Sequence, residues 1–258
     1  MIRFVSSTLA IVWLLGRCAG VCFAQYEDEL GRQLGRINAL RSGGSSVLGQ
    51  IETESAALLK VYTKPEEQGR VFYQIAMSYA QAGVWKSGGA DKVVEYAQKA
   101  LEQSIAPRLR LELYNYWGSA IIFSDRTRTL SARRADAAPV FLKGLKEARA
   151  LNVPDARPER PPPFVQQMGP GQGMDEETFK RERAKHAMEC QRVLQLEMLC
   201  GARDALQGQL VFLYSRFPRA PEELRKLATE ALGEGPEVEK LMAALTAKCE
   251  ATERRASH

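Results

Sequence analysis

Residues 65–83 read PEEQGRVFYQIAMSYAQAG, and residues 91–103 read DKVVEYAQKALEQ. Apolar side chains recur in both stretches at spacings of three and four, which is the period of an amphipathic helix. Proline in the first turn followed by two acids favours a helix start at Pro65, and Gly83 suits a helix stop. The two stretches therefore predict a pair of consecutive helices that fold back on one another.

The helical period extends through most of the chain. We expect helices over residues 26–40 and 47–62, over 107–123, and over the stretch up to Leu151. A long helical pattern follows over residues 175–217, and Gly201 and Gly208 are points where it can bend or divide. Two short helices should begin at Pro221 and Pro236, with Gly233 as the stop between them. Because no alternating strand pattern of useful length is present, the predicted fold class is all-α.

A segment rich in proline and glycine divides the chain. It runs from Asn152 to Gly173 and holds six prolines, at positions 154, 158, 161, 162, 163 and 170. Proline lacks the backbone N–H that helix interiors and central strands need, so this segment should be a linker. The predicted organisation is a signal peptide (1–24), a helical-hairpin domain (25–151), a linker (152–174) and a helical C-terminal region (175–258).

The hairpins place large and small side chains in a particular order. The first helix of each pair carries aromatic and apolar residues around a small one, and the second carries further small or apolar residues. In the first hairpin these are Phe72, Ile75, Ala76 and Tyr79, then Val93, Ala97 and Ala100; in the second they are Tyr114, Trp117, Gly118 and Ile121, then Ala138, Leu142 and Leu145. A small residue at a crossing lets two backbones approach, and the aromatics fill the space beside it. This pattern resembles the tetratricopeptide repeat (TPR) family.

The chain departs from the TPR pattern in spacing. Ala76 and Gly118 are 42 residues apart, against a family period of about 34. The surplus lies in expected loops at 84–90 and 124–134, and Pro139 falls near the start of a second helix. The pair Leu34-Gly35 suggests an earlier, degenerate hairpin over residues 26–62. The resemblance implies a short solenoid of antiparallel hairpins that binds a protein partner.

The resemblance also implies a binding surface. Ligands would be expected on the concave face made by the first helix of each hairpin, where the candidate residues are Arg70, Tyr73, Met77, Asn115 and Ser119. The alternative is that Tyr73 and Met77 pack against the preceding helix, because an aromatic at helical spacing is most often core.

The N-terminus has the features of a secretory signal peptide. Arg3 precedes an apolar run over residues 4–16, and small residues follow before Gln25. A membrane anchor is the alternative, but a span needs roughly 20 apolar residues and Arg17 interrupts this run. We expect cleavage after Ala24, export to the periplasm or the extracellular space, and no stable membrane span afterwards.

Charge and cysteine content limit the function classes. Cleavage would remove Arg3 and Arg17 and no acid, so the net charge falls from +5 to +3. The densest basic stretch is Arg126, Arg128, Arg133 and Arg134, which is typical of a solvated loop, and no nucleic-acid partner is expected.

Cys190 and Cys200 would lie about 15 Å apart on one helix, beyond the roughly 7 Å that a disulfide allows. Cys200 with Cys249 is the possible disulfide, and free buried thiols are the alternative.

One side-chain cluster invites a metal interpretation. His186 has Glu182, Glu189 and Cys190 within one turn of a helix. A structural zinc site needs four protein ligands, and a solvated helix face explains a lone cluster more simply. No nucleophile elbow, paired-histidine zinc motif or phosphate-binding loop is present.

The sequence therefore predicts an exported, non-enzymatic scaffold that binds proteins and uses no cofactor or metal. The alternatives are an exported metal-dependent or carboxylate-using hydrolase and a purely structural component of the cell envelope.

Overall fold

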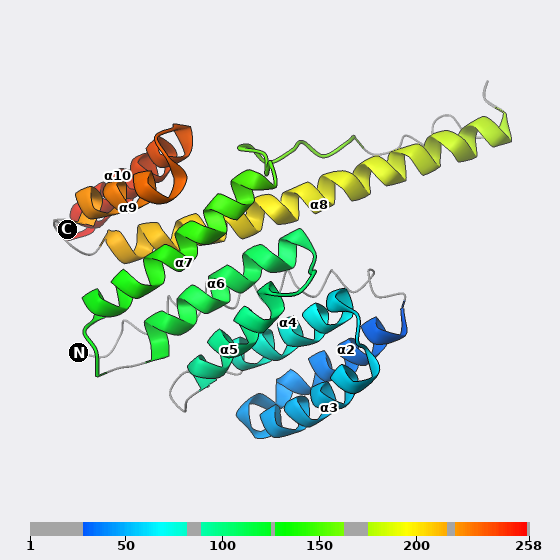
Figure 1. Ribbon diagram of the computed structural model, residues 1–258. Helices are drawn as coiled ribbons and strands as arrows, with labels where there is room; N and C mark the ends of the chain where they lie inside the picture. The colour runs from blue at the N-terminus through cyan, green and yellow to red at the C-terminus, as the bar shows by residue number, and fades with distance from the viewer. Residues whose placement is uncertain (1–27, 82–88, 125–126, 163–174, 216–219, 257–258) are drawn as a thin grey trace.

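The computed structural model describes residues 28–81, 89–124, 127–162, 175–215 and 220–256 (Figure 1). Within these ranges the chain is helical and contains no strand, so the all-α prediction is confirmed. The expected signal peptide, residues 1–24, lies outside the described residues. No helix in the described ranges is long and apolar enough to span a bilayer.

The helices follow in the order given next, and the longest connection is the segment between α7 and α8. They are α2 (Glu29–Leu40), the 3₁₀ helix η2 (Arg41–Val47), α3 (Leu48–Val61), α4 (Pro65–Gln81), α5 (Gly89–Leu101), α6 (Pro107–Ser124), α7 (Leu130–Ala150), α8 (Glu176–Tyr214), α9 (Ala220–Leu232) and α10 (Pro236–Ala256). The expected stop at Gly233 is present, with a left-handed φ of 76° that glycine adopts without strain.

The expected loop over residues 124–134 was too long. The start of α7 lies at Leu130, inside the expected loop at 124–134, because Thr129 caps it: the Thr129 hydroxyl accepts a hydrogen bond from the Ala132 N–H at 3.2 Å. Pro139 is therefore well inside the helix. The long helix α8 is continuous, as the pattern over residues 175–217 predicted, and neither Gly201 nor Gly208 divides it.

Helices α2, α4, α6 and α8 form a row in which each contacts the next, while α3, α5 and α7 pack between successive members (Figure 1). Close crossings hold the row together. A Cβ atom built on Gly118 of α6 would lie 2.5 Å from the buried ring of Phe141 on α7. A Cβ on Gly144 of α7 would lie 2.8 Å from Leu206 of α8. Glycine is needed at both positions because neighbouring side chains already fill the space that a Cβ atom would occupy.

The largest buried cluster joins α6 and α7 to the three C-terminal helices. Its members include Leu111 and Tyr114 of α6, Phe141 of α7, Leu206 of α8 and Leu241 of α10. The C-terminal region therefore shares its hydrophobic core with the second hairpin. The linker segment does not separate two independent cores, although residues 152–162 are non-helical as expected.

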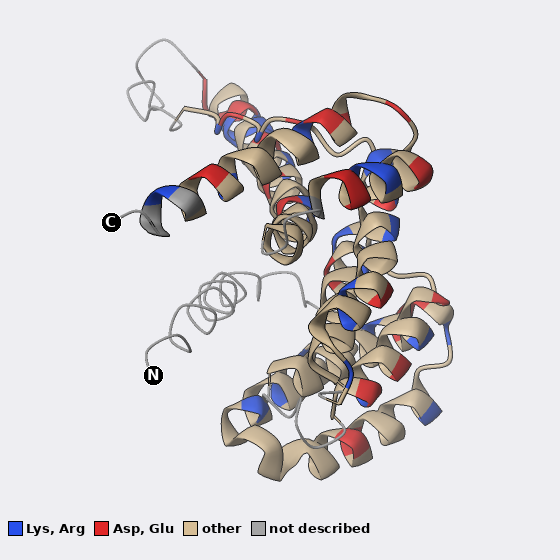
Figure 2. Cartoon of the chain, turned by 90° about the vertical axis from the view of Figure 1, so that its left-hand side faces the viewer, with Lys and Arg blue, Asp and Glu red and all other residues tan. Residues whose placement is uncertain are grey.

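A buried cation reinforces the same junction. The side chain of Arg134 on α7 is 6 % exposed, and its Nη2 lies 2.7 Å from the carboxylate of Glu223 on α9. Its guanidinium carbon is 4.6 Å from the centre of the Tyr214 ring on α8. Elsewhere, positive and negative side chains are interspersed along the helices (Figure 2). Arg134, predicted as part of a solvated basic stretch, is thus a buried link between three helices.

Candidate functional site

The expected binding face lies on α4 and α6. Its first residue, Arg70 of α4, forms an ion pair at the start of α2. Both terminal nitrogens of Arg70 donate to the Asp28 carboxylate, at 2.6 and 3.0 Å. Asp28 also caps α2 by accepting from the Gly31 N–H at 2.6 Å. The hydrogen bond from Arg70 is the main reason that the pKa of Asp28 falls to about 2. Arg70 therefore joins α4 to α2.

Tyr73 and Met77 pack inside the body. They are 5 % and 9 % exposed, and the Tyr73 hydroxyl lies 3.3 Å from the Met77 sulfur. The hydroxyl also donates a short hydrogen bond to the carboxylate of Glu112 on α6, and Arg108 donates to the same carboxylate at 2.8 Å. Burial raises the pKa of Tyr73 well above its ordinary value, and the Glu112 charge adds to this effect. Both side chains are thus buried, as the packing alternative expects, but against the following helices α5 and α6 and not against the preceding helix.

Asn115 and Ser119 remain partly accessible on α6. Together with Arg108 and Glu112 they occupy positions i, i+4, i+7 and i+11, which lie along one side of a helix. We call these four residues the α6 polar stripe. The side-chain oxygen of Asn115 is buried and accepts no hydrogen bond. The accessible part of the expected face is therefore reduced to Asn115 and Ser119, and Asn115 carries an unsatisfied acceptor.

A cavity of about 320 Å³, which the sequence did not indicate, lies where α7, the 153–157 segment and the C-terminal helices meet. It is lined by Leu145, Ala148, Arg149, Val153, Asp155, Arg157, Arg203, Asp204, Gln207, Leu232, Glu237, Lys240 and Leu241. Its walls carry one more basic than acidic side chain. The contributing residues are far apart in the sequence, so no local motif could have revealed the cavity.

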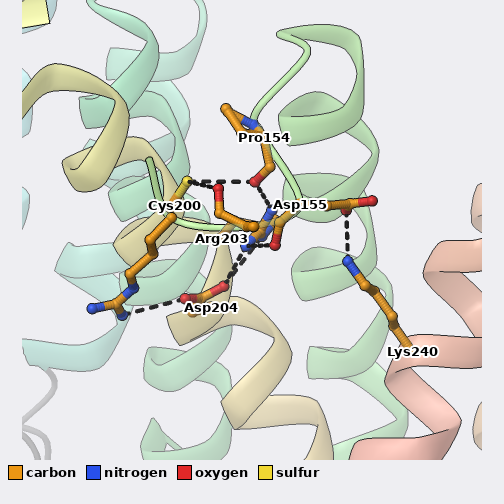
Figure 3. Close-up of polar contacts among 8 residues, drawn as sticks. Pro154, Asp155, Cys200, Arg203, Asp204 and Lys240 are labelled. Carbon is orange, nitrogen blue, oxygen red and sulfur yellow. Dashed lines mark hydrogen bonds and ion pairs between the residues drawn. The ribbon is translucent and has the colours of Figure 1, made fainter. Parts of the chain in front are cut away.

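Charged pairs at the cavity hold the 154–157 segment in place (Figure 3). Arg203 of α8 donates a short hydrogen bond to the Pro154 carbonyl and another to the Asp155 carbonyl at 3.3 Å. The Asp155 carboxylate pairs with Lys240 of α10 at 2.9 Å, and this pairing lowers its pKa. Asp204 lies 2.7 Å from Arg203. These contacts hold the 154–157 segment against α8 and α10, so we assign the cavity a structural role.

The cysteines are free thiols in the structure. Cys190, Cys200 and Cys249 form no disulfide, so the possible Cys200–Cys249 bridge is not made. The buried Cys200 thiol instead faces the Pro154 carbonyl, with a sulfur–oxygen distance of 3.4 Å (Figure 3).

The environment of His186 is a helix surface against a loop. Its Nε2 lies 2.8 Å from the Pro162 carbonyl oxygen, and its Nδ1 lies 3.6 Å from the Cys190 sulfur. Glu182 and Glu189 do not complete a ligand set: within the described ranges, no three His, Cys, Asp or Glu side chains are grouped closely enough to hold a metal ion.

Comparison of the chain with family models, with curated proteins and with solved structures found no match.

Proposed function

We propose that this chain is an exported, non-enzymatic, TPR-like scaffold that binds a protein partner through the α6 polar stripe. The row formed by α2, α4, α6 and α8 supports the proposal most directly. In that row the first helix of each predicted hairpin contacts the first helix of the next, as stacked hairpins require. Such a stack presents a continuous surface made from several helices, which suits an extended partner segment.

The chemistry of the stripe indicates what kind of contact it makes. An unpaired, buried acceptor such as the Asn115 oxygen costs about 1–3 kcal/mol. That oxygen is enclosed, but the rest of the Asn115 side chain and Ser119 are partly accessible, and an extended segment offers backbone groups for hydrogen bonds at nearly every residue. Ser119, one turn further along α6, can both donate and accept. We therefore propose that the partner docks main chain against Asn115 and Ser119.

The test is crosslinking with mass spectrometry in the native cell envelope, followed by recovery of the partner with variants. We expect crosslinks from residues next to the stripe, and about a tenfold loss of partner affinity in Asn115→Ala, since one hydrogen bond to a polar group is worth about 1.4 kcal/mol. The stability of Asn115→Ala should be unchanged or higher, because the substitution removes an unsatisfied group.

Tyr73→Phe is the matched control. It removes the hydrogen bond to Glu112, a member of the stripe outside the proposed contact at Asn115 and Ser119, so it should lower stability while leaving partner recovery unaltered. Recovery of no partner from the exported fraction, or a partner whose affinity follows stability alone, would contradict the proposal.

A further inference from the structure

The N-terminal half of α8 extends beyond the other helices and carries a partly exposed thiol (Figure 1). From Glu176 to Leu199 no side chain is buried, and Cys190 lies within this range. The two other described cysteines are more enclosed: Cys200 is fully buried, and Cys249 packs against the largest core cluster. Cys190 is therefore a thiol that a molecule in solution can reach.

Cys190 lies beside an imidazole. Its sulfur is 3.6 Å from Nδ1 of His186, one helical turn earlier on α8. The other ring nitrogen, Nε2, lies 2.8 Å from the Pro162 carbonyl oxygen. A carbonyl oxygen only accepts hydrogen bonds, so Nε2 carries the proton and Nδ1 of the neutral ring is an acceptor. The Cys190 thiol can therefore donate its proton to Nδ1.

The carbonyl that orients His186 belongs to a segment that is fastened to α8. Arg160, two residues before Pro162, donates to both oxygens of the Glu197 carboxylate, at 2.9 and 3.0 Å. A nucleophile within reach of a base, with the base oriented by a third group, is the arrangement of an activated nucleophile. Cys190, His186 and the Pro162 carbonyl occupy these three positions.

The surroundings of Cys190 favour one class of reaction. Acyl transfer needs hydrogen-bond donors for an oxyanion. The backbone N–H groups around Cys190 belong to the interior of a continuous helix, where they bond to carbonyl groups of the same helix. Thiol–disulfide exchange forms no oxyanion, and it needs only a thiolate with access to a disulfide sulfur. The geometry therefore suits exchange better than hydrolysis.

We propose that Cys190 is a reactive thiol that forms a mixed disulfide with a small organic disulfide, with His186 as the base. The thiol proton passes to Nδ1 of His186, and Sγ attacks one sulfur of R–S–S–R. An Sγ–S bond forms as the S–S bond breaks, and the leaving thiolate takes the proton from Nδ1. The products are Cys190–S–S–R and R–SH, so the Cys190 sulfur is oxidised and the leaving sulfur is reduced.

The cysteine count agrees with a thiol that reacts outside its own chain. The predicted mature chain holds three cysteines, so at least one of them cannot pair within it. Disulfides persist in the compartments to which the expected signal peptide would direct the chain, so the co-reactant would be available there. This availability rests on the predicted export, whereas the arrangement of thiol and base does not.

The test measures how fast each thiol of the mature chain reacts with glutathione disulfide, by peptide mass spectrometry on quenched samples. Cys190 should react several times faster in the folded chain than in the chain unfolded by urea, because only the folded helix places the base beside it. Cys200 and Cys249 should react more slowly when folded, because packing hinders access to them. A thiol reductant should release the adduct from Cys190.

His186→Gln separates the base from the contact with the linker segment. Glutamine can still donate a hydrogen bond to the Pro162 carbonyl, but it cannot take up a proton. The folded Cys190 should then react at least about tenfold more slowly, with thermal unfolding unchanged. Gln195→Ala changes another exposed side chain of α8 and is the control, which should leave the reaction rate unaltered.

Three results would overturn the proposal. They are a Cys190 that reacts no faster in the folded chain than in the unfolded one, a Cys249 that reacts as fast as Cys190, and an unchanged rate in His186→Gln. Asn115→Ala should leave the Cys190 rate unchanged, and Cys190→Ser should leave partner recovery unchanged. This inference and the proposed function therefore fail separately.

Discussion

Replacing Gly118 by alanine sets two opposing effects against each other. Alanine in a helix interior is favoured over glycine by about 1 kcal/mol. The added Cβ would lie 2.5 Å from two carbons of the Phe141 ring, roughly 1 Å closer than carbon atoms ordinarily pack. Phe141 is fully buried, so its ring cannot swing away freely, and overpacking of this kind costs about 1–3 kcal/mol. We expect Gly118→Ala to lower the free energy of unfolding by up to about 2 kcal/mol.

The assay is urea unfolding monitored by circular dichroism, with Gly201→Ala as the control. Gly201 lies inside α8, and nothing lies within 4 Å of its added Cβ, so alanine should stabilise the protein by about 0.5–1 kcal/mol. The two variants should therefore change stability in opposite directions. Adding Phe141→Leu to Gly118→Ala should cost less than Phe141→Leu alone. Equal stability changes for Gly118→Ala and Gly201→Ala would refute the close crossing of α6 and α7.

Three further predictions follow from single contacts. Pro139 is exposed inside α7, so Pro139→Ala should raise the free energy of unfolding by about 1–3 kcal/mol in a denaturant titration, since it restores an N–H donor; a decrease would show that proline fits this turn better than expected. Arg134→Ala should lower it by about 2 kcal/mol through loss of the contact with the Tyr214 ring and of a charged hydrogen bond; no change in the same titration would contradict the buried link. The pKa of Asp28, measured by carbon NMR, should be about 2 and return toward 3.8 in Arg70→Ala. Because this pKa is lowered on folding, the Asp28 contribution is present above about pH 4 and is lost as the pH falls through 2; an unshifted pKa would exclude the ion pair.

The sequence determined the helices and most of their bounds. Apolar residues at spacings of three and four mark α4, and proline followed by acids marks the starts of α4 and α10, because these signals act within one or two turns of the chain. Gly118 could also be identified as a small residue at a crossing, since its place between aromatic residues is local information.

Only the tertiary structure decided which side of each helix is covered. Tyr73 looked suitable for a binding face, yet it is buried because α6 supplies Glu112 for its hydroxyl. Arg134 looked like part of a solvated basic stretch, yet Glu223 and Tyr214 enclose it. A helical period shows that a helix has two sides, but the burial and charge of each side depend on residues tens of positions away. For the same reason the α6 polar stripe emerged only after the helices were placed together.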